Sequence, residues 1–167
     1  MGLFGKKEIE SIECPHVKGL PSVNAGRLCK IFIDGDSLKV SIADGGVVKI
    51  KWGKTFTIPI KNVISFDVVS QKEIAQKSKS VIGRGIAGGL IFGPVGAIIG
   101  GMSGIGAKEQ KNTQYFVNIA FYDSNDQMHV IIFKDITALR SMNFAEKFTK
   151  QYLDKNLDTN DAGEIVL

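Results

Sequence analysis

The sequence predicts a mainly β domain of the α+β class, closed by a single C-terminal helix. Three observations predict it: short runs rich in β-branched and aromatic residues alternate with glycine and aspartate turns, one amphipathic stretch follows the last run, and an uncharged glycine-rich segment interrupts the series. The 167 residues are 44% hydrophobic and 23% charged, which suits one globular domain with a buried core and excludes a disordered chain.

The strands are predicted from alternation and from the turns between them. Residues 1–26 show no clean periodicity and are expected to be a lead-in lying over the domain, which begins at residue 27. An Asp34-Gly35 turn joins the first two strands, and two glycines precede a third, in which Lys49 and Lys51 share one face. Seven strands are predicted in all, at residues 28–33, 37–42, 47–52, 55–60, 63–69, 115–121 and 128–133.

A C-terminal helix is predicted to begin at Asp135, whose carboxylate can accept the free amide hydrogens of a first turn. Apolar residues then recur at spacings of three and four, which predicts one buried stripe. Seven short strands joined by turns predict a sandwich or open barrel, and the helix is expected to close its open end. The stripe consists of Leu139, Met142, Ala145, Phe148, Tyr152 and Leu153. Residues 156–167 are expected to form a loose tail.

This order of elements resembles the PH/GRAM-like superfamily, in particular small bacterial PH-like proteins. The resemblance rests on the run Ile58-Pro59-Ile60, the following Val63-Ile64-Ser65-Phe66, and the closing helix. It covers residues 27–155 and implies a seven-stranded sandwich or open barrel capped by the helix. A glycine-rich insertion between the fifth and sixth strands is similar to one in a subset of these proteins. Phosphoinositide binding is not implied, because no matching lysine–arginine motif is present.

The insertion, residues 81–107, has the pattern of a glycine zipper. On a helix, glycines spaced four apart form a smooth strip that lets another backbone approach closely. Two such strips are present, separated by Pro94, which cannot continue a helix, so a helical hairpin is predicted. The strips consist of Gly85, Gly89 and Gly93, and of Gly96, Gly100 and Gly104.

The flanks of this segment favour a hairpin that returns to its starting side. As one span it would be roughly 33 Å long and could cross a bilayer, but each hairpin arm of about 15–18 Å reaches only half-way. A single crossing would also divide one β domain between two compartments and send basic residues across the membrane. The basic flanks are Lys77, Lys79 and Arg84 before the segment, and Lys108 and Lys111 after it. Three roles stay open: docking on the domain's own sheet or a sister subunit, membrane contact, or assembly into a pore.

No catalytic, metal or cofactor site is predicted. Gly83–Gly88 spells G-x-G-x-x-G but follows a polar linker rather than the strand that a dinucleotide site needs. Cys14, His16 and Cys29 lack the spacing and the fourth ligand of a zinc site, and the cysteines are expected to be small buried side chains. The chain is therefore predicted not to be an enzyme.

Charge and cysteine content suggest where the chain works. The net charge of +4 suits an anionic membrane surface, with Lys49 and Lys51 as candidate contacts, whereas nucleic-acid binding would require interleaved aromatic residues. Two cysteines make no disulfide framework, and no secretory signal is recognised at the first residues. A cytoplasmic protein is expected, peripheral to or partly inserted in the inner face of the cell membrane.

The functional hypothesis is a non-catalytic scaffold or adaptor that associates with membranes or forms oligomers. Its partners would be further copies of itself, membrane lipid or another protein. The alternatives are a pore-forming or membrane-perturbing effector assembled through the hairpin, and a soluble PH-like binding module.

Overall fold

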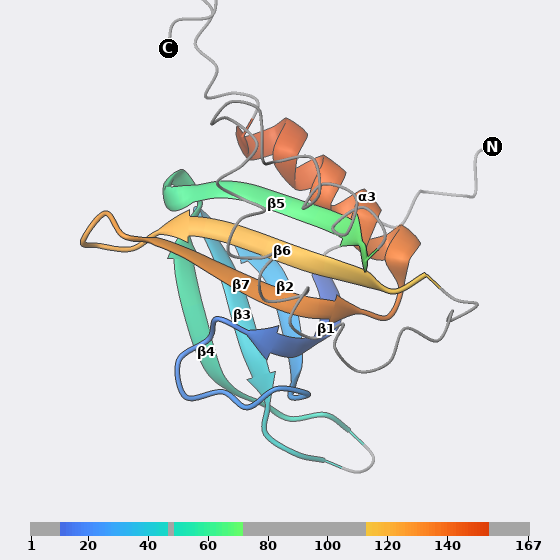
Figure 1. The fold of residues 1–167 in the computed structure, drawn as a ribbon. Helices are drawn as coiled ribbons and strands as arrows, with labels where there is room; N and C mark the ends of the chain where they lie inside the picture. Colours follow the sequence, from blue (N-terminus) through green and yellow to red (C-terminus); the bar gives the residue numbers. More distant parts are fainter. Residues whose placement is uncertain (1–10, 47–48, 72–112, 154–167) are drawn as a thin grey trace, which may run out of the picture.

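The computed structural model describes residues 11–46, 49–71 and 113–153. These residues form a seven-stranded antiparallel sheet with the order β4-β3-β2-β1-β7-β6-β5, followed by one C-terminal α-helix (Figure 1). The predicted mainly β architecture is confirmed. The elements are β1 Ser11–Lys18, β2 Leu28–Asp34, β3 Ser37–Ala43, β4 Trp52–Pro59, η1 Ile60–Asn62, β5 Val63–Ser70, β6 Tyr115–Tyr122, β7 Met128–Asp135, α3 Ala138–Phe148 and η2 Thr149–Leu153.

Strand β1 joins the two halves of the sheet. Its first part, from Ser11 to Pro15, pairs with β2, and its second part pairs with β7 through His16 and Lys18, with a change of register between these two residues. We call the half β4-β3-β2-β1 sheet A and the half β1-β7-β6-β5 sheet B. Because one strand belongs to both, the two halves enclose a common core.

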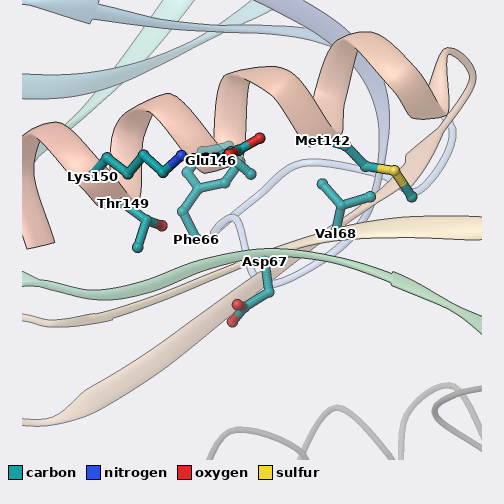
Figure 2. Close-up of a pocket in the computed structure, with 8 residues that line it drawn as sticks. Phe66, Asp67, Val68, Met142, Glu146, Thr149 and Lys150 are labelled. Carbon is teal, nitrogen blue, oxygen red and sulfur yellow. Dashed lines mark hydrogen bonds and ion pairs between the residues drawn. The ribbon is translucent and has the colours of Figure 1, made fainter. Parts of the chain in front are cut away.

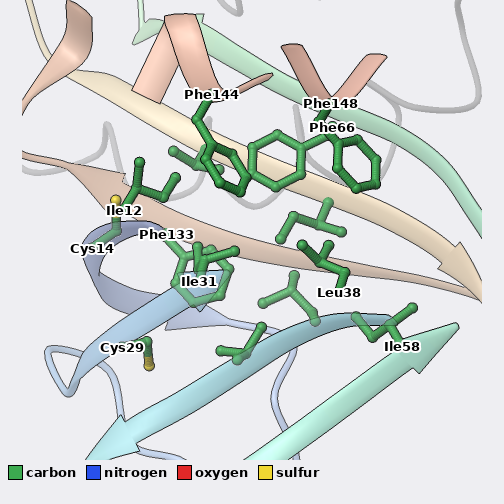
Figure 3. Packing of buried hydrophobic residues seen from close by; sticks show 14 of the residues in the cluster. Ile12, Cys14, Cys29, Ile31, Leu38, Ile58, Phe66, Phe133, Phe144 and Phe148 are labelled. Carbon is green, nitrogen blue, oxygen red and sulfur yellow. The ribbon is translucent and has the colours of Figure 1, made fainter. Parts of the chain in front are cut away.

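The core lies between the two halves and under the helix (Figure 3). Phe66 of β5 is 2% exposed, and its ring centroid lies 5.4 Å from that of Phe144 and 5.4 Å from that of Phe148, both on α3. Sheet A contributes fully buried side chains such as Ile31 and Leu38. Helix α3 thus closes the barrel by inserting two aromatic rings.

The predicted strands need two corrections near the N-terminal half. Residues 11–18, expected to belong to a lead-in, form β1, in which Ile12, Cys14 and His16 are buried in alternation. Residues 49–51, expected to be strand, precede β4. They lie in a loop that closes on itself, because the Asp44 N–H donates to Lys51 O at 2.8 Å and the Lys51 N–H donates to Gly45 O at 2.9 Å.

The helix begins later than predicted, and its buried side agrees with the predicted stripe at Ala145 and Phe148 but not at Leu139 and Met142. Asp135 ends β7, and Thr137 occupies the N-cap position. The buried residues of α3 are Ser141, Phe144, Ala145 and Phe148. Leu139 is 75% exposed and Met142 37% exposed, so the prediction that both are buried is wrong. Tyr152 and Leu153 do pack against the core, from η2.

The predicted hairpin over 81–107 and the tail over 156–167 lie outside the described residues, as do the boundaries assigned to them.

Candidate functional site

The chain leaves sheet B before the glycine-rich insertion and rejoins it afterwards at the same end of the sheet. The last residue of β5, Ser70, pairs with the first residue of β6, Tyr115. One residue further out, the Gln71 N–H donates to Gln114 O at 2.8 Å. Whatever path the chain follows between Gln71 and Gln114, it leaves and returns at the same point. We call this point, Ser70–Gln71 with Gln114–Tyr115, the root.

The root is tied to the end of β7. The Gln114 side-chain amide donates from Nε2 to Tyr115 O at 3.0 Å and to Asp135 O at 3.2 Å. Tyr115 is also the register partner of Asp135. The root therefore sits directly beside the turn that leads from β7 into α3.

A buried polar cluster fixes the start of α3 next to the root. Asp135 is 6% exposed, and its Oδ1 accepts a hydrogen bond from the Thr137 N–H at 2.9 Å and from the Ser141 hydroxyl at 2.8 Å. The Ser141 hydroxyl also lies 4.0 Å from the Cys14 sulfur of β1. Because these groups are buried, their hydrogen bonds orient the helix strictly.

Three large apolar side chains are exposed beside the root. Ile136 is 62% exposed, Leu139 75% and Met142 37%. Ile136 directly follows Asp135, and the other two lie on the first turns of α3. We call Ile136, Leu139 and Met142 the rim. The sequence interpretation had assigned Leu139 and Met142 to the core and did not single out Ile136.

The rim continues into a groove between β5 and α3 (Figure 2). The groove has a volume of about 420 Å³ and is lined by Phe66, Asp67, Val68, Met142, Ala145, Glu146, Thr149 and Lys150. Met142 belongs to both features. On the outer side of the groove, Lys150 Nζ lies 2.6 Å from Glu146 Oε1.

The candidate contact residues Lys49 and Lys51 are exposed in the connection between β3 and β4. Figure 1 shows this connection at the lower end of sheet A, away from the ends of β5 and β7. In the same region, Arg27 Nη2 donates to Ala43 O at 2.6 Å. Their role at an anionic surface stays a prediction.

The remaining candidate residues lie outside the described ranges. These are the glycines Gly85, Gly89, Gly93, Gly96, Gly100 and Gly104, with Pro94, and the basic residues Lys77, Lys79, Arg84, Lys108 and Lys111. No helix in the described ranges is both long and apolar enough to cross a bilayer.

The two histidines have structural partners. His16 is 2% exposed; its Nε2 accepts a hydrogen bond from the Leu20 N–H at 3.2 Å, so Nδ1 carries the proton toward Asn24 O at 3.3 Å. Both ring nitrogens therefore hold the β1–β2 connection. His129 Nε2 lies 2.8 Å from Asp123 Oδ2 in the β6–β7 turn. The backbone N–H of Gln127, and then His129, hold the pKa of Asp123 below its ordinary value.

Cys14 and Cys29 are buried, as predicted, and carry free thiols. Burial raises the pKa of Cys14 to about 12, with a further contribution from the nearby Asp135 carboxylate, and burial raises the pKa of Cys29 to about 11. In residues 11–46, 49–71 and 113–153, no three histidine, cysteine or acidic side chains gather closely enough to hold a metal ion.

These thiols are expected to be unreactive in the folded protein. The thiolate is the reacting form, and at about pH 8 only about one Cys14 thiol in 10,000 would be ionised. Maleimide should therefore modify both cysteines at least about 100-fold more slowly in buffer than in denaturant. Mass spectrometry of timed samples measures the two rates, and equal rates would contradict the burial of both side chains.

Comparison with known families agrees with this architecture. A family model described as glycine zipper containing PH domain matches residues 22–135. The chain belongs to this family. The resemblance to PH-like proteins with a glycine zipper is thereby confirmed.

Two curated proteins show similarity to part of this glycine-zipper PH protein. Over 79 residues it is 35% identical to an immunity protein of Bacillus phage SPbeta and to an SPbeta prophage-derived uncharacterized membrane protein of Bacillus subtilis strain 168. Each match covers 47% of this chain, but only 38% of the first relative and 34% of the second. The chain thus spans little more than a third of these relatives. No solved structure matches it.

Proposed function

We propose that this protein is a non-catalytic, cytoplasmic scaffold that attaches to a membrane through the root of its glycine-rich segment. The observation that carries the proposal is the position of the rim. Ile136, Leu139 and Met142 expose apolar side chains beside the root, where the stretch of chain that carries the uncharged residues 85–107 leaves the sheet and returns to it. The PH-like domain would present its other surfaces to a protein partner.

Two further observations support a membrane role. The paired root requires that the segment begin and end on one side of any bilayer while β5 and β6 stay paired, which fits a segment that dips into the membrane and returns. One relative is described as a membrane protein. A group of exposed apolar side chains is typical of a contact site for a protein or a membrane.

Vesicle flotation of variants with substitutions in the rim tests the proposal. In the double variant Ile136→Glu with Leu139→Glu, we expect binding to phosphatidylglycerol-containing vesicles to fall about tenfold or more, because two apolar contacts become charged. Both side chains are exposed, so the fold should persist. Tyr122→Glu is the matched control: Tyr122 is 46% exposed at the opposite end of β6, and its substitution should leave binding unchanged.

The outcomes separate the competing functions. A full chain that does not float would overturn the membrane role, and light scattering would then show whether the protein forms oligomers instead. If the full chain floats and the rim variant floats equally well, the rim is not the contact. Release of a trapped dye from the vesicles would indicate a pore-forming or membrane-perturbing protein rather than a scaffold.

The identity to the phage immunity protein favours a second candidate, an immunity function. In that case the protein would protect the cell that carries it from a harmful agent, with the membrane attachment placing it where the agent acts. Cells that express the chain, challenged with phage lysates and with culture supernatants of competing strains, should survive better than cells that express the rim variant.

A further inference from the structure

Sheet B carries a second apolar cluster, separate from the core. Its buried members are Val69, Phe116 and Ile132, with the partly buried Val17 and Val130 packed against them. Successive strand residues point to opposite faces, and the neighbours Val117 and Phe133 belong to the core. The second cluster therefore lies on the outer face of sheet B, away from the helix. We define this outer face by its buried residues Ser65, Val69, Phe116, Asn118, Ala120 and Ile132; the half-buried Asp67 and Val130 lie on the same face.

The outer face is buried although the described elements lie elsewhere. Ala120 and Ile132 are 0% exposed and Asn118 is 1% exposed. Helix α3 packs on the opposite side through Phe144 and Phe148, and in Figure 1 the faces of β6 and β7 that are turned to the reader have no coloured element in front of them. A sheet face in water keeps its side chains partly exposed, as Thr55 and Thr57 are on β4. The burial of the outer face therefore requires a cover.

We propose that the outer face of sheet B is the docking surface for the glycine-rich segment of the same chain, residues 81–107. The chain outside the described ranges between residues 71 and 113 starts and ends at this sheet. Ser70 and Gln71 follow Val69 directly, and Gln114 and Tyr115 precede Phe116. The stretch of chain that contains the segment thus leaves and returns beside two members of the apolar cluster.

The chemistry of the segment matches the surface. Residues 85–107 carry no charge and contain many glycines, which let a backbone approach closely. The surface offers the small side chains of Ser65 and Ala120 for such an approach. It also carries two buried acceptors without a hydrogen-bond partner among the described residues, Ser65 Oγ and Asn118 Oδ1. Backbone N–H groups of a close-lying glycine-rich chain are the donors that such atoms require.

The two ends of the chain fit this surface less well. Residues 154–167 contain four acidic side chains, Asp154, Asp158, Asp161 and Glu164, and follow η2, which adjoins α3 on the other side of the sheet. Residues 1–10 lead into β1, whose first part pairs in sheet A. Charge and connectivity thus select the inserted segment. The docking surface goes beyond the proposed function: it describes the protein in the absence of a membrane, with the segment on the sheet rather than in a bilayer.

Thiol labelling tests the docking surface in the full chain. In Ala120→Cys, the new thiol should react with maleimide about 100-fold more slowly than in the control Thr57→Cys, which places a cysteine at an exposed strand position. Cys14 and Cys29 should stay silent in both proteins and report that the fold is intact. Equal rates at positions 57 and 120 in a folded chain would overturn the proposal.

A second variant identifies the occupant. When residues 82–107 are replaced by a short Gly-Ser linker, the thiol at position 120 should react as fast as the one at position 57, while Cys14 and Cys29 stay silent. Continued protection at position 120 would overturn the assignment to this segment. Protection that is lost when the full chain is diluted would assign the surface to a second copy and likewise overturn it.

Comparing the labelling in buffer with the vesicle flotation keeps the two proposals apart. A protected thiol at position 120 in buffer supports the docking surface even if the chain does not float. A reactive thiol in buffer refutes the docking surface even if the chain floats.

Discussion

Replacing Phe148 with alanine is expected to lower the free energy of unfolding by about 3–5 kcal/mol. The Phe148 side chain is 1% exposed, and its ring packs at 5.4 Å from Phe66 and at 5.3 Å from Tyr152. The substitution removes apolar area and leaves a cavity where α3 meets β5, in a place where the surrounding strands cannot collapse to fill it. Urea unfolding followed by circular dichroism measures the change.

Leu139→Ala is the matched control for this prediction. Leu139 lies on the same helix and belongs to the same predicted stripe, but it is 75% exposed. Its substitution should change the free energy of unfolding by no more than about 0.5 kcal/mol. A loss at Leu139 as large as that at Phe148 would show that the helix is rotated relative to the arrangement described above.

The positions of most strands along the chain could be predicted from the sequence because they depend on local signals. The Asp34-Gly35 turn and the alternating runs on either side of it lie within a few residues of each other, and five of the seven strands begin and end within two residues of their predicted bounds. Strand β1 was missed because its buried positions include a cysteine and a histidine. The sequence of β1 is polar, and its buried side depends on the hydrogen bonds of His16 with Leu20 and Asn24.

The buried side of α3 could not be fully predicted from the pattern of apolar residues. A stripe drawn through the most apolar residues includes Leu139 and omits Ser141, but Ser141 is 0% exposed because its hydroxyl binds the Asp135 carboxylate. A hydrogen bond between the end of β7 and the helix therefore sets the rotation of α3. The same contact exposes the rim, which no local pattern indicates.

The root was anticipated only in part. The sequence predicted that the insertion returns to its starting side, and the pairing of Ser70 with Tyr115 gives that expectation a structural basis. The burial of the outer face, in contrast, had a signal that the sequence interpretation did not use. Residues 115–121 and 128–133 are nearly continuous apolar runs, which is typical of strands covered on both faces.

Replacing Gly19 with alanine is expected to lower the free energy of unfolding by about 3 kcal/mol or more. Gly19 has a φ of +106°, a region that side chains with a β-carbon rarely adopt. A β-carbon at this position would lie 2.2 Å from Val130 O and 2.8 Å from Ile131 Cα. Both are backbone atoms of β7, so the clash cannot be relieved by rotating a side chain.

Gly35→Ala separates the two causes of this cost. Gly35 also has a positive φ, of +57°, but no atom of the described residues lies within 4 Å of its would-be β-carbon. Its substitution should cost only about 1–2 kcal/mol, the strain of the backbone alone. The larger loss at Gly19 would then measure how closely the β1–β2 connection crosses β7, at the junction where sheets A and B meet. Equal losses at the two glycines in thermal and urea unfolding would mean that β7 can move aside, and that the junction of the two sheets is less rigid than the pairing of β1 with both halves implies.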